Sequence, residues 1–559
     1  MFTKCAVVCA AAWLSAAVPV AILAQDAKTI LTNTAEAMGA GNLRTIQFSG
    51  TGSNAGIGQN ANPNVSWPVA RVKAYSRQMD FGADASLVEM TWVQGGIDQT
   101  RNESISSGSP WSSQFSFWIS PFGFIKGALA NGATVSYATM DGMKYAVVTF
   151  TLQNKYKVAG YINDQNLIER VQTWVDNDVL GDMLAEAWYS VYKDFGGVKF
   201  PTMIVEKQGG FPVLILSVSD AKANAVVNIP APPVQAGASA GAPAVTVQTV
   251  KVADGVFYLK GGTHHSAAVE FSDHVVVIEA PLNERRSLAV IGEVKKLIPN
   301  KPIRYVINTH HHFDHSGGLR TYIDEGAAIV THETNKDFYA KALSTPRTLS
   351  ADRLPQARKE AIIETVADKR TLSDSMRTLE LHLIKDNPHH DGILMAFLPN
   401  EKILIEADVY TPANPVANAA PVTASVNRNT MNVVDNVERL KLDFETILPL
   451  HGSVTPVRAD LYAALGKPVR DMKDILSAKP AVAQGQRGQA GQAAPASVAE
   501  QVLDKSCTGC HNLNRVQNKK LNQADWRATV VRMKDRGAEI SDSEIDALVE
   551  FLVKTFGPQ

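Results

Sequence analysis

Four histidines and an aspartate occupy six consecutive positions, 310 to 315, within the stretch INTHHHFDHSGG at residues 307–318. Imidazole is the commonest metal ligand in proteins, and a carboxylate beside it is typical of a polar, open site. His310 and His312 alternate, so on an extended loop their side chains point the same way. We therefore predict that this stretch binds metal ions.

Other histidines of the chain can complete this set. The distant His389 would make three nitrogen ligands with His310 and His312, whereas His311 is expected to point away. The pair HH at residues 264–265 either lines the pocket or is structural. Three further histidines are interpreted as structural: His274, His332 and His382.

A second pocket is predicted from Asp314, His315 and His451. A carboxylate at Asp408 can bridge two cations and offset their mutual repulsion, and one open position between the metals then holds a shared water. With two cations bound, the pKa of this water falls towards neutrality and the exposed metal face polarises a carbonyl. Asp314 is the predicted catalytic residue, because it would orient the resulting hydroxide. The predicted reaction is hydrolysis of an ester, thioester, lactone or amide.

The segments around the cluster follow an α/β order. HVVVIEAP (residues 274–281) is typical of a buried strand, RSLAVIGEVKKLI (286–298) of an amphipathic helix and IRYVIN (303–308) of the next strand. The histidines then fall on a loop that leaves a strand, where α/β proteins place their sites. Residues 335–374 are predicted to be a mostly helical insertion, either a lid over the site or packing.

The stretch THHHFDH matches the His-x-His-x-Asp-His signature of the metallo-β-lactamase superfamily, and the middle of the chain resembles that family throughout. Its later motifs follow in order as NPHHDG, PNEKILIEADVY ending near Asp408, and FETILPLHG ending near His451. The resemblance implies an αββα sandwich over residues 247–476. It also favours His389 over His390 as a ligand, because members commonly carry glycine three residues after that ligand.

Two divalent metal ions are expected, with zinc as the default and iron or manganese as alternatives. Relatives that reduce oxygen with di-iron usually replace the second histidine of the motif by glutamate, whereas this chain keeps His312. That difference argues against an oxygen-reducing di-iron enzyme. A mononuclear iron dioxygenase of the kind that oxidises persulfides keeps similar residues, so an iron-dependent redox enzyme is the alternative function.

The last segment contains SCTGCHNL, in which Cys507, Cys510 and His511 form a Cys-x-x-Cys-His motif. Two thiols at this spacing form thioethers with haem vinyl groups, and the adjacent imidazole ligates the iron. Residues 499–559 resemble a small all-α c-type cytochrome domain carrying one covalent haem c. Met533 is then either the distal ligand or core filling. An electron-transfer protein with an uncoupled hydrolase domain is a further alternative.

Two stretches rich in Ala, Pro, Gly and Gln divide the chain into a multidomain protein. Residues 229–246 and 477–498 cannot bury a core and are predicted to be linkers. Residues 26–228 alternate in the manner of strands and predict a β-rich accessory domain. Its later part, residues 166–224, resembles the half-barrels of lipoprotein-carrier-like periplasmic proteins. The domain contains no His or Cys, so it is a poor candidate for metal or acid-base chemistry. We interpret it as a docking or spacing module, with a site for an apolar ligand or a partner as the alternative.

Composition limits the partners and the location. The formal net charge is -1 and no Lys/Arg-rich block occurs, which argues against nucleic-acid binding. Residues 1–24 have the layout of a secretory signal peptide, with a retained membrane anchor as the alternative. We expect a protein exported to the bacterial periplasm, with no membrane span after cleavage. Its expected partners are a small-molecule substrate and, for the haem, a periplasmic redox protein.

Overall fold

The computed structural model divides the chain into two compact units, Met1–Ser477 and Ala478–Gln559. No helix among the described residues is long and apolar enough to cross a membrane. Cys507, Cys510 and His511 lie outside these residues, so the haem site stays a prediction. The described residues are 20–94, 97–232, 245–350, 354, 360–412, 428–452, 455–469, 521–535 and 540–556.

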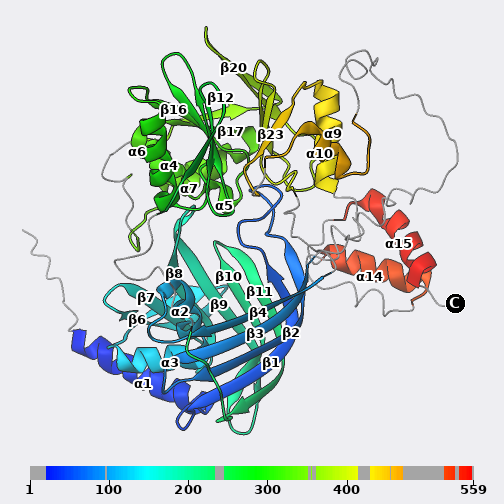
Figure 1. Cartoon of the computed structure of the whole chain (residues 1–559). Coiled ribbons are helices and arrows are strands. Elements are labelled where there is room, and N and C mark those ends of the chain that lie inside the picture. Colours follow the sequence, from blue (N-terminus) through cyan, green and yellow to red (C-terminus); the bar gives the residue numbers. More distant parts are fainter. Residues whose placement is uncertain are drawn as a thin grey trace, which may run out of the picture. The chain divides into compact units, whose positions relative to one another are not determined.

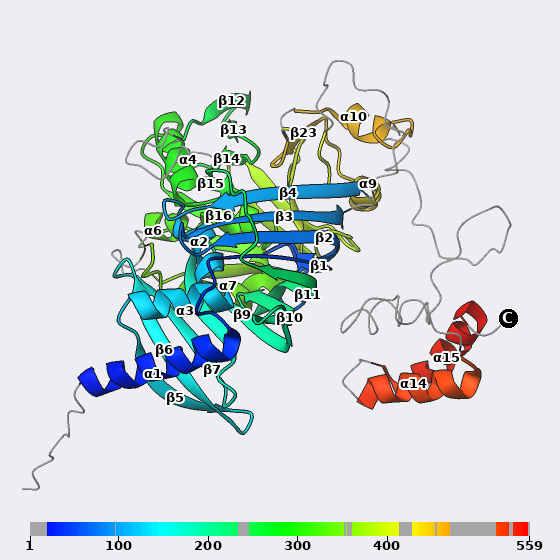
Figure 2. The ribbon, with the colours of Figure 1, turned by 90° about the horizontal axis from the view of Figure 1, so that it is seen from below.

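The N-terminal part is β-rich, as predicted. It forms one eleven-stranded sheet in the order β4-β3-β2-β1-β11-β10-β9-β8-β7-β6-β5, in which all neighbours pair antiparallel. The sheet curves around three helices, which lie along the β5–β8 part (Figures 1 and 2). The strands are β1 (Thr45–Ala55), β2 (Val69–Asp80), β3 (Ala85–Gln94), β4 (Ile97–Ile105), β5 (Thr134–Met140), β6 (Met143–Leu152), β7 (Tyr156–Ile162), β8 (Ile168–Asn177), β9 (Gly181–Asp194), β10 (Lys199–Gln208) and β11 (Phe211–Ala223), and the helices are α1 (Val20–Met38), α2 (Trp111–Trp118) and α3 (Pro121–Ala130).

Strand alternation explains why this sheet folds around its helices. In β8, Val171, Thr173 and Val175 are buried and the residues between them are half-exposed, which is the period of two that one covered face requires. The helices bring large aromatic side chains to that face, including Phe117 and Phe124. The apolar core of this domain therefore lies between the curved sheet and the three helices.

The middle part contains two sheets, as the αββα expectation requires. One has seven strands in the order β12 to β18 and the other has five in the order β19 to β23. Their strands are β12 (Gln248–Ala253), β13 (Val256–Lys260), β14 (Ser266–Glu270), β15 (Val275–Ile278), β16 (Ile303–Ile307), β17 (Ala328–His332), β18 (Ile363–Val366), β19 (Lys369–Ser373), β20 (Thr378–Leu383), β21 (Leu394–Leu398), β22 (Ile403–Glu406) and β23 (Thr446–Pro449).

Helices cover the outer face of each sheet (Figure 1). The first sheet packs against α4 (Glu284–Leu297), α6 (Leu319–Glu325) and α7 (Lys336–Ser344), and the second against α9 (Arg428–Leu440) and α10 (Arg458–Ala463). The buried strand β15 serves both layers: Val276 and Ile278 pack between the sheets, whereas Val275 and Val277 pack against helices. A strand buried on both faces is apolar throughout, which is why residues 274–281 could be recognised from the sequence as a buried strand.

The prediction of a mostly helical insertion over residues 335–374 is wrong for its second half. Among the residues of this stretch that the structure describes, α7 is the one helix of more than one turn, and the stretch after residue 360 forms β18 and β19. These strands are four and five residues long and pair with β17 and β20 at the edges of the two sheets. Short edge strands with exposed charged residues carry little alternation, so their partners rather than their own sequence decide their structure.

The C-terminal unit contains two described helices, α14 (Gln523–Asp535) and α15 (Asp542–Phe556). Trp526 and Val530 of α14 pack with Leu548 and Val549 of α15. The backbone N–H of Ser541, just before α15, donates a hydrogen bond to the Glu544 carboxylate at 2.7 Å. Met533 lies on α14. Two packed helices agree with an all-α segment, while its cytochrome character stays a prediction.

Candidate metal centre

The histidine cluster lies at the carboxyl end of β16 and runs into the short helix α5 (Phe313–Ser316). Strands β15, β16 and β17 are parallel, so their carboxyl ends meet at one edge of the sheet. Glu279 follows β15 at this edge and is fully buried. Its carboxylate accepts hydrogen bonds from Thr309 Oγ1 at 2.5 Å and from Asn308 Nδ2 at 3.2 Å. One acidic side chain therefore holds the start of the histidine loop.

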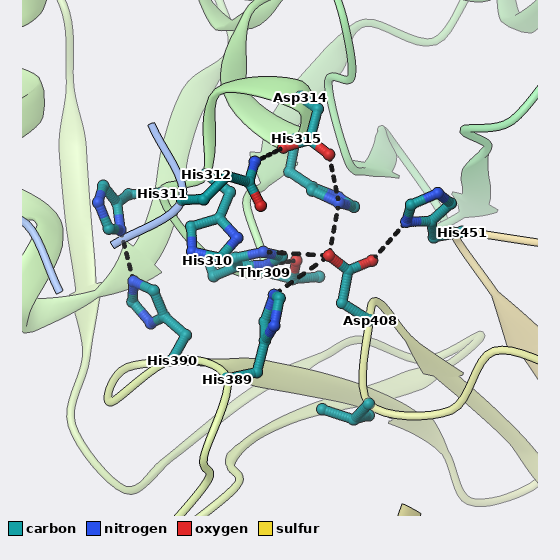
Figure 3. A network of polar contacts seen from close by, with 12 residues as sticks. Thr309, His310, His311, His312, Asp314, His315, His389, His390, Asp408 and His451 are labelled. Atoms are coloured by element: carbon teal, nitrogen blue, oxygen red, sulfur yellow. Dashed lines mark hydrogen bonds and ion pairs between the residues drawn. The ribbon is translucent and has the colours of Figure 1, made fainter. Parts of the chain in front are cut away.

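One group of candidate ligands is nitrogen-rich, and two of its four members are buried. Its four ligand atoms lie within 4.8 Å of one another. The Nε2 atoms of two of these histidines face Asp408 Oδ2, at 3.7 Å for His310 and 3.2 Å for His389 (Figure 3). Loops after β16, before β21 and after β22 bring them together. We call this the first group, and its members are His310, His312, His389 and Asp408.

A second group of four lies beside the first and is more open to solvent. Asp314 Oδ2 lies 3.1 Å from His264 Nε2 and 3.7 Å from His315 Nε2. His264 reaches this place because it forms an isolated β-bridge with His451, so both histidines belong to one pair of adjacent loops. We call this the second group, and its members are His264, Asp314, His315 and His451.

Asp408 lies between the two groups. Its Oδ2 atom is 3.1 Å from His315 Nε2, and its Oδ1 atom is 2.9 Å from His451 Nδ1 (Figure 3). Its backbone has a φ of 63°, which is unusual for a residue other than glycine and is typical of functional sites. The carboxylate thus contacts ligand atoms on both sides, which is the position predicted for a bridging ligand.

The electrostatics of the centre favour the protonation states that metal ligands need. Burial lowers the pKa of His312 to about 4 and that of His310 well below its usual value, so both imidazoles are neutral. Although burial opposes it, the neighbouring His315, His389 and His451 hold the pKa of Asp408 far below its usual range. Neutral imidazoles beside an ionised carboxylate are the forms that bind a cation.

His315 differs from the other ligand histidines. Burial lowers its pKa, but the carboxylates of Asp408 and Glu279 outweigh burial and raise the pKa well above the usual value. Its Nδ1 atom lies 3.2 Å from Glu279 Oε2, and its Nε2 atom faces the centre. A carboxylate behind an imidazole is the arrangement that orients metal-binding histidines and increases their basicity. Metal binding at His315 would therefore release a proton.

The nitrogen and oxygen atoms that face the centre fit a pair of divalent cations. The ring nitrogen of His310 that faces away from the centre contacts Thr309 Oγ1 at 3.0 Å, and that of His312 contacts the Asn60 carbonyl oxygen at 3.0 Å. The nitrogens that face the centre are buried and make no hydrogen bond within the described residues: His310 Nε2, His312 Nδ1, His315 Nε2 and His389 Nε2. Imidazole and carboxylate donors in two adjoining groups suit zinc, iron or manganese.

The structure separates the adjacent histidines 389 and 390. His390 contacts His311 Nδ1 through its Nε2 atom and accepts a hydrogen bond from Gly392 N at Nδ1, so both of its nitrogens face away from the centre (Figure 3). His311 also contacts Asn60 Oδ1 at 2.9 Å. This pairing leaves His389 to point at Asp408.

Sequence reasoning did not assign three residues that the structure places at the centre. Glu279 stands at the end of the apolar stretch HVVVIEAP, and a carboxylate at that point is a signal that could have been used. Gln59 and Asn60 come from the N-terminal domain and contact Asp314 and the histidine loop. No local spacing links them to residues some 250 positions away. The N-terminal domain is therefore more than a spacing module.

Comparison with known proteins gives a family for the middle of the chain. Residues 259–448 match the model described as the Metallo-beta-lactamase superfamily. The 2,4-dinitroanisole O-demethylase subunit alpha of Nocardioides sp. (strain JS1661) is 26% identical over 213 residues, which cover 37% of this chain and 58% of that protein. The chain thus matches less than two thirds of the length of this curated relative.

Solved structures are similar over part of the chain. A metallo-beta-lactamase from Pontibacter korlensis has 18% identity and a TM-score of 0.30, covering 40% of this chain and 98% of its own. The rubredoxin oxygen:oxidoreductase from Desulfovibrio gigas has 16% identity and a TM-score of 0.30, covering 39% of this chain and 60% of its own.

Proposed function

We propose, from the premise that residues 259–448 form a metallo-β-lactamase superfamily domain and that the chain is an enzyme, that it is a metal-dependent hydrolase. The proposed substrates are an ester, thioester, lactone or amide. The observation that carries the proposal is the pair of adjoining ligand groups with Asp408 between them. Zinc is the proposed metal.

Two divalent ions held in such a centre lower the pKa of a shared water and polarise the bond to be cleaved. His310, His312 and His389 would hold one ion, and the second group would hold the other. The protein's own contribution is to fix these side chains before substrate arrives, because an ordered site saves the cost of reorganisation during the reaction.

Asp314 is the residue best placed to orient the attacking water. One of its oxygens accepts a hydrogen bond from Gln59 Nε2 at 2.8 Å, and the other faces His264 and His315. Its side chain is 28% exposed, whereas that of His310 is fully buried. Substrate would therefore approach from the side of the second group, where the Asp314 carboxylate would lie beside the attacking water and orient it.

The printed name of the curated relative adds one substrate class. An O-demethylase subunit that acts on 2,4-dinitroanisole takes an activated aryl methyl ether. Hydrolysis of such an ether would break a C–O bond, as hydrolysis of an ester or lactone does, so this class belongs in the substrate panel beside them.

We further infer one covalent haem c at Cys507, Cys510 and His511, with Met533 as the distal ligand, and export to the periplasm after removal of residues 1–24. The Cys-x-x-Cys-His motif supports the haem. It also favours a second candidate function, an iron-dependent redox enzyme whose middle domain exchanges electrons with the haem. Hydrolysis needs no electrons, so the metal in the middle domain discriminates between the two functions.

Elemental analysis of the full chain tests the proposal. The protein is purified from a host that matures c-type cytochromes, and zinc, iron and manganese are counted per haem. Two zinc ions and one haem iron are expected, with turnover in a panel of esters, thioesters, lactones, amides and activated aryl ethers. Iron in clear excess over haem would instead assign the middle domain to redox chemistry.

A further inference from the structure

A loop of the N-terminal domain reaches the metal centre. We propose that this loop, residues 58–62, is part of the centre. It positions Asp314 and His312, and it links the loop that carries them to the loop that carries His389. The inference rests on the proposed function, because it assigns residues that support the same metal site. It means that the N-terminal domain supplies residues that position the metal ligands.

The first contact is made to Asp314. Gln59 Nε2 donates a hydrogen bond to Asp314 Oδ1 at 2.8 Å. Asp314 Oδ2 then points to His264 Nε2 and His315 Nε2, the ligand atoms of the second group. An amide that donates to one carboxylate oxygen uses a lone pair of that oxygen and fixes the plane of the group, so that the other oxygen faces the cation. Gln59 therefore sets which oxygen of Asp314 serves the second group.

The second contact is made to His312. The Asn60 backbone carbonyl oxygen lies 3.0 Å from His312 Nε2, and it can only accept. Nε2 must then carry the hydrogen, which leaves Nδ1 free to bind a cation. His312 Nδ1 is buried without a hydrogen bond among the described residues and belongs to the first group. Asn60 therefore selects the tautomer that the first group requires.

The loop also braces itself and the neighbouring histidine pair. Asn60 Nδ2 donates to the carbonyl oxygens of Asn62 at 2.7 Å and Val65 at 2.9 Å. Its Oδ1 atom lies 2.9 Å from His311 Nε2, and His311 contacts His390. Asn60 is only 3% exposed. A buried amide with its donors and its acceptor all used has one orientation, so the loop is rigid at the site.

A third set of contacts reaches the loop that carries His389. Asp391 N donates to the Ala61 carbonyl oxygen at 2.8 Å, and Asn62 Nδ2 donates to Asp391 Oδ2 at 2.6 Å. Asp391 is two residues beyond His389. Residues 59–62 thus hydrogen-bond to both loops that supply histidines to the first group, although these loops come from different sheets of the middle domain.

The close fit of the loop requires glycine at position 58. Gly58 has a φ of +72°, and a Cβ atom there would lie 2.2 Å from the ring of Phe313, the residue between His312 and Asp314. Phe313 N donates to the Gly58 carbonyl oxygen at 3.3 Å, and the Trp67 ring packs edge-on against Phe313 at 6.3 Å. The backbone of the loop therefore lies directly against the motif that carries the ligands.

Mere docking of two domains does not account for this pattern. The domains also meet through Arg347, which pairs with Asp176 far along the chain from the histidine motif. Gln59 and Asn60 of the loop, by contrast, contact Asp314 and His312. In each of these two side chains, the contacted atom lies opposite the proposed metal-binding atom. Partners placed on that opposite atom tune metal sites, and their loss typically weakens metal binding by roughly 10- to 100-fold.

Cobalt binding to the full chain tests the inference. Co²⁺ is titrated into metal-free protein, and its visible absorption reports the number and geometry of bound ions. Gln59→Ala removes the hydrogen bond to Asp314, and we expect one of the two ions to bind about 10-fold more weakly or worse, with an altered spectrum. Asn64→Ala, which removes an exposed amide from the same segment, is the matched control and should bind both ions as the unaltered protein does.

A second variant separates positioning from folding. Gln59→Met keeps the length of the side chain but has no donor, and it should show the same weakened ion. Thermal unfolding of the metal-free proteins checks that each variant is folded. Two ions bound with unchanged affinity and spectrum in both Gln59 variants would overturn the inference alone. Fewer than two ions in the unaltered protein would overturn the proposed function, and this inference with it.

Discussion

The two ligand groups lie side by side but differ in exposure and in chemistry. In the first group, the His310 and His312 side chains are almost completely buried, and three of the four members are imidazoles whose nitrogens converge on one carboxylate. In the second group, Asp314 is 28% exposed and His451 is 35% exposed. His389 of the first group is 22% exposed. The two most exposed ligands therefore both belong to the second group.

Their supports differ in origin as well. In the first group, Thr309 of the same loop contacts the Nδ1 atom of His310, and the Asn60 carbonyl oxygen contacts the Nε2 atom of His312. The second group depends on Glu279 behind His315 and on Gln59 behind Asp314. A buried, nitrogen-rich group is expected to retain its ion more firmly, and an exposed group with side-chain supports is expected to exchange ions and meet the substrate. Three substitutions test this difference.

The largest effect is expected from His310→Ala. It removes a fully buried ligand from the first group and leaves Asp408 without one of its imidazole neighbours. Loss of a residue that hydrogen-bonds to a metal ligand typically lowers activity by up to roughly 100-fold. Because this substitution removes a ligand itself, we expect the rate of hydrolysis to fall by more than that. Steady-state kinetics with metal analysis measures this. His274→Ala, a buried histidine outside both groups, is the control, and equal losses in the two variants would contradict the assignment of the first group.

A smaller and more selective effect is expected from Glu279→Gln. The amide keeps the size of the side chain but loses the charge behind His315 and one acceptor for Thr309. Metal affinity of the second group should fall by roughly 10- to 100-fold while the first group keeps its ion. Metal titration of the full chain measures both affinities.

Glu325→Gln, which removes a carboxylate paired with Lys295 away from the site, is the matched control for Glu279→Gln. It should leave both affinities unchanged. Equal weakening of the two groups in the Glu279 variant would show that Glu279 supports both groups to the same extent, and would remove the expected difference between them.

The smallest effect on the site is expected from Arg347→Ala. Arg347 pairs with Asp176 at 2.9 Å and with Asp178 at 3.5 Å, and its side chain is only 5% exposed. Losing these charged hydrogen bonds should lower the free energy of unfolding by about 1 to 3 kcal/mol. Denaturant unfolding measures that loss, and cobalt titration should find both ions bound as before. Weakened binding in the second group would mean that docking of the whole domain, and not residues 58–62, supports it.

Local sequence was sufficient for the elements that carry the ligands. The stretch at residues 274–281 is apolar because β15 is buried on both faces, and that pattern is visible without a structure. The same logic failed for β18 and β19, which are short, charged and placed at sheet edges. Patterns of apolar residues report which faces are buried, so they identify central strands and miss edge strands that have little to bury.

The spacing His310, His312, Asp314 and His315 already determined that several metal ligands share one loop, because residues that are close in sequence must be close in space. Only the tertiary structure decided which atoms face the centre. It paired His390 with His311, brought His264 beside His451, and set Gln59 behind Asp314 across 255 positions. Such contacts arise from the packing of separate loops and domains, and no local pattern of side chains encodes them.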